Sequence, residues 1–523
     1  MTQDASWGRA AETAGGAAGG NAAGGEPLSA LLAAGDPSRA AFVVPDDGQI
    51  LTYGQVGARI ETLAGRLAGA GVRRGDRVAL ALPNGPDFVQ LLLAVTALGA
   101  AAAPLNPAYT DSEFRFFLED IAPRLLLIPA SRPAAAASAA QVTGTTVLTV
   151  ETVGDGPPQL LSAGTAAAAM ASFERGGADD IGVVLHTSGT TSRPKQVPLR
   201  QRNLMASVRT IGAHYRLGPA DVSFCVMPLF HIHGLVASTF AALGAGGTVV
   251  VPKRFTPHRF WPQAREHGAT WLSAGPTLHQ MILDKAGAAA PSATLRFVRS
   301  CSSALSPALL ERAENSYGVP MLEAYGMTEA SHQMASNPLP PAPRPAGCVG
   351  VPTGTEISVV DAQGRPQADG TAGEVVIRGP GVMSGYVNNP AATAEAFFGS
   401  WFRTGDRGVL RGGYLYLDGR LKEMILRGGE NIGPAEIEQV LLSHPAVRDA
   451  VCFGVPDDKY GELVSAAVTV SQETDARALI EHCRGQLAAF KVPAVIHILA
   501  EIPRTATGKV QRRRVAEFVA GGQ

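Results

Sequence analysis

Short apolar runs alternate with longer amphipathic segments along most of the chain. Runs rich in Val, Leu, Ile and Ala that end at Gly, Pro or polar residues are typical of buried strands. Segments with apolar residues at helical spacing, such as Pro307–Tyr317, lie between several of these runs. Because strands and helices alternate, the pattern predicts a layered α/β fold. The expected strands are 78–82, 125–128, 146–150, 181–186, 222–226, 248–251, 270–274 and 295–300.

The longest apolar stretch extends from Phe88 to Leu105 and is interrupted by Gln90, Thr96 and Gly99. A stretch of about 18 residues is at the lower limit for a membrane-spanning helix. The interruptions favour instead a buried helix that runs into a strand. We therefore expect no membrane segment here.

From Gly350 the pattern changes to short strands separated by glycine turns, which indicates a small β unit attached to the main body. The tail beyond Arg420, of about 100 residues, has the size of a compact α+β domain. The expected strands in these two parts are 357–360, 374–378, 414–417, 450–455 and 464–470, and the expected helices are 434–443 and 476–490.

The chain has 523 residues, and a single hydrophobic core rarely grows beyond about 250–300 residues. We predict a large domain at 26–421, made of layered α/β subdomains and the small β unit. A small α+β domain is predicted at 422–523. Residues 1–25 are rich in Ala and Gly and are expected to form a disordered arm.

Charge and cysteine content exclude several classes of protein. There are 44 Lys and Arg residues against 45 Asp and Glu, a net charge of −1, whereas nucleic-acid-binding domains usually have a basic excess. The five cysteines lie far apart and form no CxxC pair, which argues against a disulfide framework or a thiolate zinc site. The N-terminus has no basic segment followed by a Leu-rich one, so no secretory signal is expected. We expect a cytoplasmic protein without nucleic-acid or membrane partners, and the oligomeric state stays open.

The most informative segment is a β-run that opens at residue 181 into a loop of hydroxyl residues and glycine, followed by a cation. Backbone N–H groups, hydroxyls and a cation suit a polyphosphate. This is not a Walker loop, because Pro194 and Gln196 flank Lys195. Taken alone, the segment could also be a solvated Ser/Thr-rich turn. The candidate phosphate-binding residues are Thr187, Ser188, Gly189, Thr190, Thr191 and Lys195.

The loop resembles the phosphate loop of the adenylate-forming superfamily, which includes acyl-CoA synthetases, luciferases and peptide-synthetase adenylation domains. Further motifs of that superfamily follow in the expected order, so that the resemblance spans residues 187 to 509. Ser192 and Gln196 are departures, because the superfamily usually has glycine at both places. The matching motifs are Tyr325-Gly-Met-Thr-Glu329, Trp401-Phe-Arg-Thr-Gly-Asp406, Gly419-Arg-Leu-Lys-Glu423, Arg427-Gly-Gly-Glu430 and Pro503-Arg-Thr-Ala-Thr-Gly-Lys509.

The resemblance implies an enzyme that uses ATP, Mg²⁺ and CoA to activate a small carboxylic acid. An acid and the ATP α-phosphate are both anionic, so their charge must be neutralised during the attack. The resemblance assigns Thr328 to the α-phosphate, Glu329 to Mg²⁺ and Lys509 to the forming acyl–phosphate bond. Without the motifs, Lys509 would be read as a solvated lysine and Asp406 as a turn residue. The remaining nucleotide contacts that it implies are Ser303, Ala304, Glu323, Ala324, Tyr325 against adenine, Asp406 on the ribose hydroxyls, and Arg420.

The resemblance also implies that the small domain is mobile and rotates between two half-reactions. The pivot would be Lys422. One orientation would bring Lys509 to the acid and ATP. The other would present a loop that helps to form the pantetheine tunnel for CoA. The residues of that loop are Arg427, Gly428, Gly429 and Glu430.

Three polar residues, His231, Ser302 and His332, are expected in the acid pocket. An unpaired buried polar group costs about 1–3 kcal/mol, so an apolar acid would not suit them. Histidine can donate charge-assisted hydrogen bonds to a second carboxylate. The surrounding residues are similar to the branch of the superfamily that joins oxalate to CoA, and this resemblance implies the three residues as oxalate contacts. His233 is undecided, and Cys301 is interpreted as a small buried residue.

Other functions stay open at this point. The acid could be malonate, another short polar acid or a medium-chain acid. The adenylate could serve a carrier protein in place of CoA, or the fold could have kept binding and lost catalysis. The presence of Lys195, Glu329, Asp406, Arg420 and Lys509 argues against a non-catalytic protein.

Overall fold

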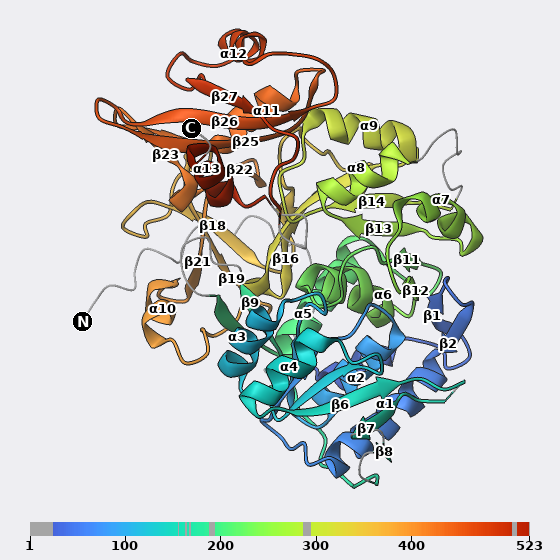
Figure 1. Cartoon of the computed structure of the whole chain (residues 1–523). Helices are drawn as coiled ribbons and strands as arrows, with labels where there is room; N and C mark the ends of the chain where they lie inside the picture. Colours follow the sequence, from blue (N-terminus) through green and yellow to red (C-terminus); the bar gives the residue numbers. More distant parts are fainter. Residues whose placement is uncertain are drawn as a thin grey trace.

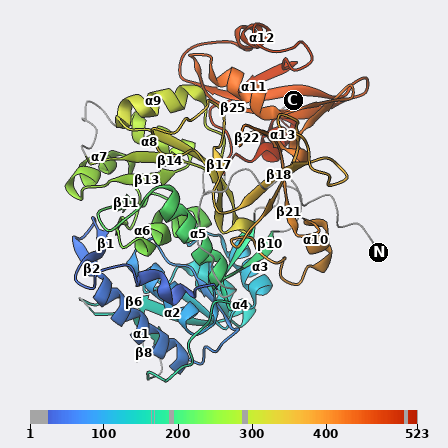
Figure 2. The same ribbon diagram turned by 180° about the vertical axis from the view of Figure 1, so that it is seen from behind.

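The computed structural model describes residues 25–154, 156–162, 165–166, 169–187, 194–285, 294–504 and 510–521. The predicted arm lies, apart from Gly25, outside the described residues. The chain folds into an N-terminal part with two large sheets, a small β unit and a C-terminal part at one end of the molecule (Figures 1 and 2). This is the α/β architecture that the sequence predicts.

An eight-stranded sheet, in the order β10-β9-β4-β3-β5-β6-β7-β8, forms the first layer. Alternate strand residues face opposite sides: Val78 and Leu80 pack into the core with α1 and α2, whereas Ala79 faces α3 and α4. The strands are β3 Arg77–Leu80, β4 Ala101–Pro104, β5 Leu125–Pro129, β6 Thr146–Glu151, β7 Gln159–Ser162, β8 Thr165–Ala166, β9 Ile181–Thr187 and β10 Lys195–Arg200. The helices are α1 Tyr53–Gly69, α2 Pro86–Ala97, α3 Asp111–Ile121 and α4 Ala134–Thr143.

A nine-stranded sheet, in the order β17-β16-β15-β14-β13-β11-β12-β1-β2, forms the second large layer. Helices α5 and α6 and the π-helix η2 share one hydrophobic core with both sheets, and α7, α8 and α9 cover the other face. The strands are β1 Ala40–Val44, β2 Gln49–Thr52, β11 Val222–Phe224, β12 Thr248–Val250, β13 Trp271–Ala274, β14 Phe297–Ser300, β15 Met321–Met327, β16 His332–Ser336 and β17 Val351–Pro352. The helices are α5 Gln201–His214, η2 His233–Phe240, α6 Ala241–Gly244, α7 Pro257–Glu266, α8 Pro276–Asp284 and α9 Pro307–Tyr317.

The small β unit leads into a C-terminal part with a hydrophobic core of its own. Two polar contacts join that part to α8: Arg448 Nη2 is 2.8 Å from Asp284 Oδ2, and Arg504 Nη1 is 3.1 Å from Thr277 Oγ1. The β unit contains β18 Glu356–Val360, β19 Gly373–Arg378, α10 Pro390–Glu395, β20 Phe397–Phe398, β21 Trp401–Arg411 and β22 Tyr414–Arg420. The C-terminal part contains β23 Ile425–Arg427, β24 Glu430–Ile432, α11 Pro434–Leu442, β25 Val447–Asp457, β26 Gly461–Val470, α12 Ala476–Arg484, β27 Val495–Ile498 and α13 Arg512–Gly521. Short 3₁₀ turns are η1 Leu28–Leu32, η3 Thr328–Ala330 and η4 Leu421–Glu423.

The predicted strands are all present, with ends that differ by a few residues. The long apolar stretch is a buried helix, α2, followed by the strand β4, as expected. One helix was predicted too long: α12 ends at Arg484 rather than at residue 490. Gly485 follows directly, and glycine disfavours helix continuation because it loses the most backbone entropy. In the described part of the chain no helix is long and apolar enough to span a membrane.

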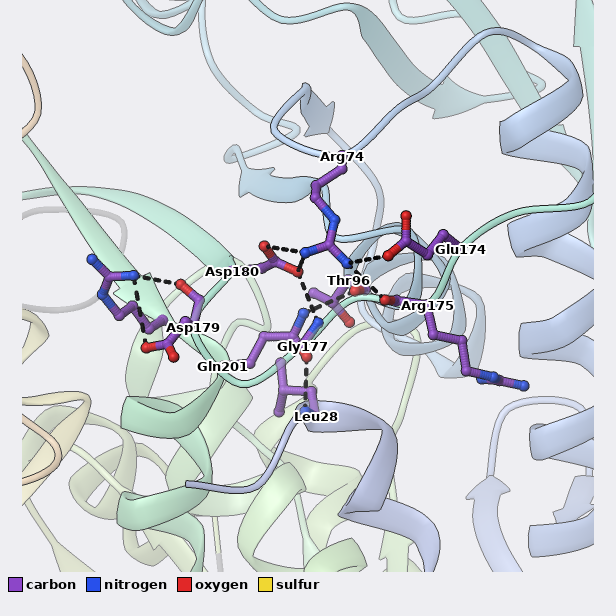
Figure 3. A network of polar contacts seen from close by, with 10 residues as sticks. Leu28, Arg74, Thr96, Glu174, Arg175, Gly177, Asp179, Asp180 and Gln201 are labelled. Atoms are coloured by element: carbon purple, nitrogen blue, oxygen red, sulfur yellow. Dashed lines mark hydrogen bonds and ion pairs between the residues drawn. The ribbon is translucent and has the colours of Figure 1, made fainter. Parts of the chain in front are cut away.

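A group of polar contacts centred on Arg74, here called the Arg74 network, holds the chain in place before β9 (Figure 3). Arg74 Nη1 is 3.2 Å from Asp180, its Nη2 is 3.7 Å from Glu174, and Asp180 accepts from the Gly177 backbone N–H at 2.8 Å. Gln201, whose N–H donates to the Asp180 carbonyl, links this group to η1 and α2. The network therefore fixes the start of the strand that leads to Thr187.

Candidate active site

The candidate phosphate-binding residues Thr187 and Lys195 lie where β9 and β10 pair. Lys195 and Thr187 are direct partners in the antiparallel ladder. The Lys195 ammonium lies 4.6 Å from the centre of the Tyr386 ring, and the Tyr386 hydroxyl donates to Glu329 Oε1 at 3.1 Å. Tyr386 thus links the cation to the acidic residue, and it is not among the site residues predicted from the sequence. The predicted residues Ser188, Gly189, Thr190 and Thr191 lie outside the described residues.

Thr328 and Glu329 lie in the 3₁₀ turn η3 between β15 and β16. Burial raises the pKa of the Glu329 carboxyl, whereas the Tyr386 hydrogen bond opposes this shift. In the described part of the chain, no group of three His, Cys, Asp or Glu residues could hold a metal ion. A single buried carboxylate fits Mg²⁺, which usually takes one or two carboxylates together with substrate phosphates and water.

The candidate nucleoside pocket brings together three predicted residues from separate strands. The Tyr325 hydroxyl, on β15, donates to Asp406 Oδ2 on β21. Arg420, at the end of β22, pairs with Asp406 across the ladder, and its Nε is 3.2 Å from Asp406 Oδ1. Burial raises the pKa of Tyr325 well above its usual value, so the phenol stays protonated and donates. Asp406 is therefore a fixed, buried acceptor.

A second group of predicted nucleotide contacts lies where the end of β14 pairs with the middle of β15. Ser303 and Ala304 are exposed in the loop after β14, and Glu323 and Ala324 belong to β15. The loop approaches Glu323, since the Leu305 N–H donates to its Oε1 at 3.4 Å. Burial raises the pKa of Glu323 to about 8, so its carboxyl is mainly neutral near neutral pH.

The structure places the predicted acid-pocket residues around His233, the first residue of η2. The His233 N–H lies 3.3 Å from His231 Nδ1, its Nδ1 is 2.9 Å from Ser302 Oγ, and its ring centre is 4.9 Å from that of His332. Gly326 permits the approach of β16, because a Cβ there would lie 2.2 Å from the His332 carbonyl oxygen. His233, which was undecided from the sequence, is therefore the connecting residue of the pocket.

Arg299, in the middle of β14, lies behind these residues and is completely buried. Its guanidinium is 3.3 Å from His233 Nε2 and 3.4 Å from His332 Nδ1. Its signal in the sequence is a charged residue inside an apolar strand. The other guanidinium contacts are with Ser273 Oγ at 2.7 Å, Tyr215 Oη at 2.9 Å and Gln333 Oε1 at 3.1 Å.

The charge in this pocket differs from the expectation. Burial, His332 and Arg299 hold the pKa of His233 well below its usual range. Burial and Arg299 do the same to the pKa of His332. Both rings are neutral near pH 7, so the expected charge-assisted bonds from histidine are wrong for His332. The positive charge belongs to Arg299 instead.

Two loops at the pocket have unusual backbone angles. The φ values are 78° at Ser302, 53° at Ser331 and 100° at His332. Residues other than glycine rarely adopt positive φ, and such strain concentrates at functional sites. The backbone thus holds two of the predicted acid contacts in orientations that an ordinary strand would not give.

The predicted CoA and hinge residues lie together near the small β unit. Lys422 belongs to η4, and Arg427 and Glu430 pair across the tight hairpin of β23 and β24. Gly428 and Gly429 form its turn with φ of 59° and 88°, which favours glycine. Lys509 lies outside the described residues.

Two protein-family models match the chain. The AMP-binding enzyme model matches residues 31–387, and the AMP-binding enzyme C-terminal domain model matches residues 436–509. The chain belongs to the AMP-binding enzyme family, and thus to the adenylate-forming superfamily that its motifs resemble.

Individual relatives and solved structures agree with that assignment. An oxalate–CoA ligase of Arabidopsis thaliana is 46% identical over 482 residues, covering 89% of this chain and 93% of that protein. The oxalate–CoA ligase of Saccharomyces cerevisiae is 39% identical, with 86% and 88% covered, and a sulfoacetate–CoA ligase of Cupriavidus necator is 38% identical, with 93% and 96% covered. ATP-bound MatB from Rhodopseudomonas palustris has a TM-score of 0.85 at 30% identity, with 94% and 99% covered.

Proposed function

We propose that this enzyme joins oxalate to CoA in two steps. A carboxylate oxygen of oxalate attacks the α-phosphorus of ATP, the bond to the β-phosphate breaks, and pyrophosphate leaves. The CoA thiolate then attacks the oxalyl carbonyl carbon of the adenylate, and AMP leaves. The observation that carries this proposal is the polar cluster in which His231, Ser302 and His332 gather around His233, next to the buried Arg299.

The chemistry of the neighbouring residues supports the proposal. A dicarboxylate needs hydrogen-bond donors and positive charge around it, because carboxylate oxygens only accept. Two relatives are named oxalate–CoA ligases, and the sulfoacetate of a third also carries a second anionic group.

Each predicted residue then has a task in the reaction. Lys195 neutralises phosphate charge, Thr328 contacts the α-phosphate and Asp406 accepts from the ribose hydroxyls. Mg²⁺, held by Glu329 and the phosphates, would supply further charge neutralisation when bound. Lys509 reaches the forming acyl–phosphate bond. These placements lower the electrostatic barrier between two anions.

The second step uses the predicted small domain, 422–523, against the large one, 26–421. We propose that it pivots at Lys422 and presents the Arg427–Glu430 hairpin for the pantetheine of CoA. A cytoplasmic location without nucleic-acid or membrane partners is part of the same proposal. The Lys509→Ala variant should lose adenylation and keep thioester formation from supplied oxalyl-AMP. Equal loss of both half-reactions would remove Lys509 from its role.

The decisive experiment is a substrate panel. AMP and acyl-CoA are measured with MgATP and CoA in the presence of oxalate, sulfoacetate, malonate, acetate, octanoate or coumarate. Oxalate should have the highest kcat/KM, and the short dianions should exceed acetate. Preference for octanoate or coumarate would contradict the pocket assignment. Acyl-adenylate formation without transfer to free CoA would point to a carrier protein instead.

A further inference from the structure

We infer that Arg299 is the positioning residue of the acid pocket: its contacts leave His332 and Ser302 as hydrogen-bond donors, and its positive charge selects an acid with a second anionic group. The inference rests on the proposed function and deepens it, because it assigns the origin of selectivity to a residue behind the pocket. The inference follows from which atoms of Arg299 and its neighbours can donate a hydrogen bond and which can only accept one.

The contacts of His233 determine where its proton lies. A guanidinium has only donors, and Arg299 Nη1 is 3.3 Å from His233 Nε2. His233 Nε2 is therefore an acceptor, and it accepts a second hydrogen bond from the Ser273 hydroxyl at 2.7 Å. Ser273 Oγ in turn accepts from Arg299 Nη1 at 2.7 Å. The His233 proton is on Nδ1 and is donated to Ser302 Oγ at 2.9 Å. Ser302 keeps its own hydroxyl hydrogen for another acceptor.

The same reasoning applies to the other two histidines. Arg299 Nη2 faces His332 Nδ1 at 3.4 Å, so the neutral ring of His332 carries its proton on Nε2. His231 Nδ1 accepts from the His233 backbone N–H at 3.3 Å, which leaves the Nε2–H of His231 as a donor. The three residues thus present donors, and donors are what an ionised carboxylate requires.

The charge of Arg299 has no acidic partner among its contacts in the described part of the chain. The side chains that it contacts include no carboxylate: they are Tyr215, His233, Ser273, Cys301, His332 and Gln333. A buried charge is costly unless it is paired. The second carboxylate of the acid would supply that missing charge, whereas a neutral substrate tail would leave the cost in place.

Two substitutions separate charge from positioning. Arg299→Met keeps a long side chain and removes the charge and all donors, whereas Arg299→Lys keeps the charge and loses the fork geometry that reaches both histidines. Arg74→Met is the matched control, because it removes an arginine of the Arg74 network. Folding is checked by circular dichroism and thermal unfolding. For each folded variant we measure kcat and KM for oxalate and for glycolate, which has one carboxylate, and KM for ATP.

Arg299→Met should lower kcat/KM for oxalate about 100-fold and the oxalate/glycolate ratio by at least about 10-fold, because charged hydrogen bonds contribute about 1.5–3 kcal/mol. KM for ATP should stay within about twofold, since Arg299 lies on the acid side. Relative to Arg299→Met, Arg299→Lys should restore the oxalate/glycolate ratio of kcat/KM more fully than it restores kcat. A folded Arg299→Met enzyme that keeps the wild-type ratio would overturn the inference.

A further variant covers the case in which Arg299→Met does not fold. Ser273→Ala removes one partner shared by Arg299 and His233, and should raise KM for oxalate several-fold with KM for ATP unchanged. An unchanged KM for oxalate would contradict the positioning role of Arg299. The substrate panel of the wild-type enzyme distinguishes the two proposals. Preference for another acid would contradict the oxalate assignment alone. The selectivity ratio of each variant would then be measured with that acid and with its neutral analogue.

Discussion

Two arginines organise polar groups in this protein, and they do so in opposite ways. Arg74 is on the surface, with 48% of its side chain exposed, and contacts the carboxylates of Asp180 and Glu174. Arg299 is completely buried, and its described contacts are with neutral groups. Exposed ion pairs contribute about 0–1 kcal/mol, whereas an unpaired buried charge destabilises the fold.

The difference teaches where to look for function. The Arg74 network satisfies its own charges and joins segments that must stay together, so its role is structural. The charge of Arg299 has no acidic partner among its described contacts. Such an arrangement is expected at a functional site, where a bound ligand supplies the missing charge. Four predictions test this distinction.

The largest effect is expected for His233→Leu. The substitution removes the ring that contacts both Arg299 and Ser302, so kcat/KM for oxalate should fall about 100-fold through lost positioning. Gln201→Leu, a buried change beside the Arg74 network, should leave kcat/KM of the folded enzyme within about twofold. Equal losses in steady-state assays of both variants would erase the distinction.

The next effect concerns pH. The buried His233 and His332 have pKa values far below the usual 6.5. Below that pH the unfolded chain binds protons that the folded protein does not. The free energy of unfolding should therefore fall with decreasing pH, by about 1.4 kcal/mol per unit for each such histidine. Urea unfolding between about pH 5 and 8 should give a shallower slope for His233→Leu, and an identical slope would contradict the prediction.

A smaller effect is expected for Asp180→Asn. The change weakens the contacts of this side chain with Arg74 and with the Gly177 N–H, so stability should fall by about 1 kcal/mol. Asp179→Asn, at a carboxylate with 71% exposure, should change stability by less than about 0.5 kcal/mol. The measurement is the urea midpoint of each variant. A larger loss for Asp179→Asn would show that exposure does not govern these pairs.

The smallest effect is the response to salt. Raising NaCl from about 0.05 M to about 0.5 M shortens the screening length to a few ångströms. The stability difference between wild type and Asp180→Asn should then shrink by a few tenths of a kcal/mol. The difference between wild type and His233→Leu should stay constant, because that pocket is buried. If the stability difference between wild type and His233→Leu changed with salt, solvent would have access to the cluster around Arg299.

Sequence signals predicted elements best where local chemistry determines the ends. Helix α9 is bounded as expected: Ser306 caps its first turn, Pro307 occupies its first position, and Gly318 follows it with φ of 71°. Helix α12 was extended too far because apolar spacing continued beyond Gly485 while the backbone did not.

The site was predictable only in part. The motifs brought His231, Ser302 and His332 to one place, and they lie close together around His233. The protonation of the two buried histidines could not be read from residue types, because it depends on burial and on Arg299, which approaches from another strand. Tyr386 lies in a segment without a motif, and only the tertiary structure brings it to Glu329.

The left-handed backbone at Ser302, Ser331 and His332 implies a trade-off between thermal stability and catalytic activity. Such conformations cost about 1–3 kcal/mol each for a residue with a Cβ, and glycine would relieve that cost. Selection for heat tolerance alone would therefore favour glycine at these positions, and the hydroxyl of Ser302 and the imidazole of His332, which we propose to contact the acid, would be lost. Stabilising substitutions in this enzyme should therefore be sought at other positions in the fold.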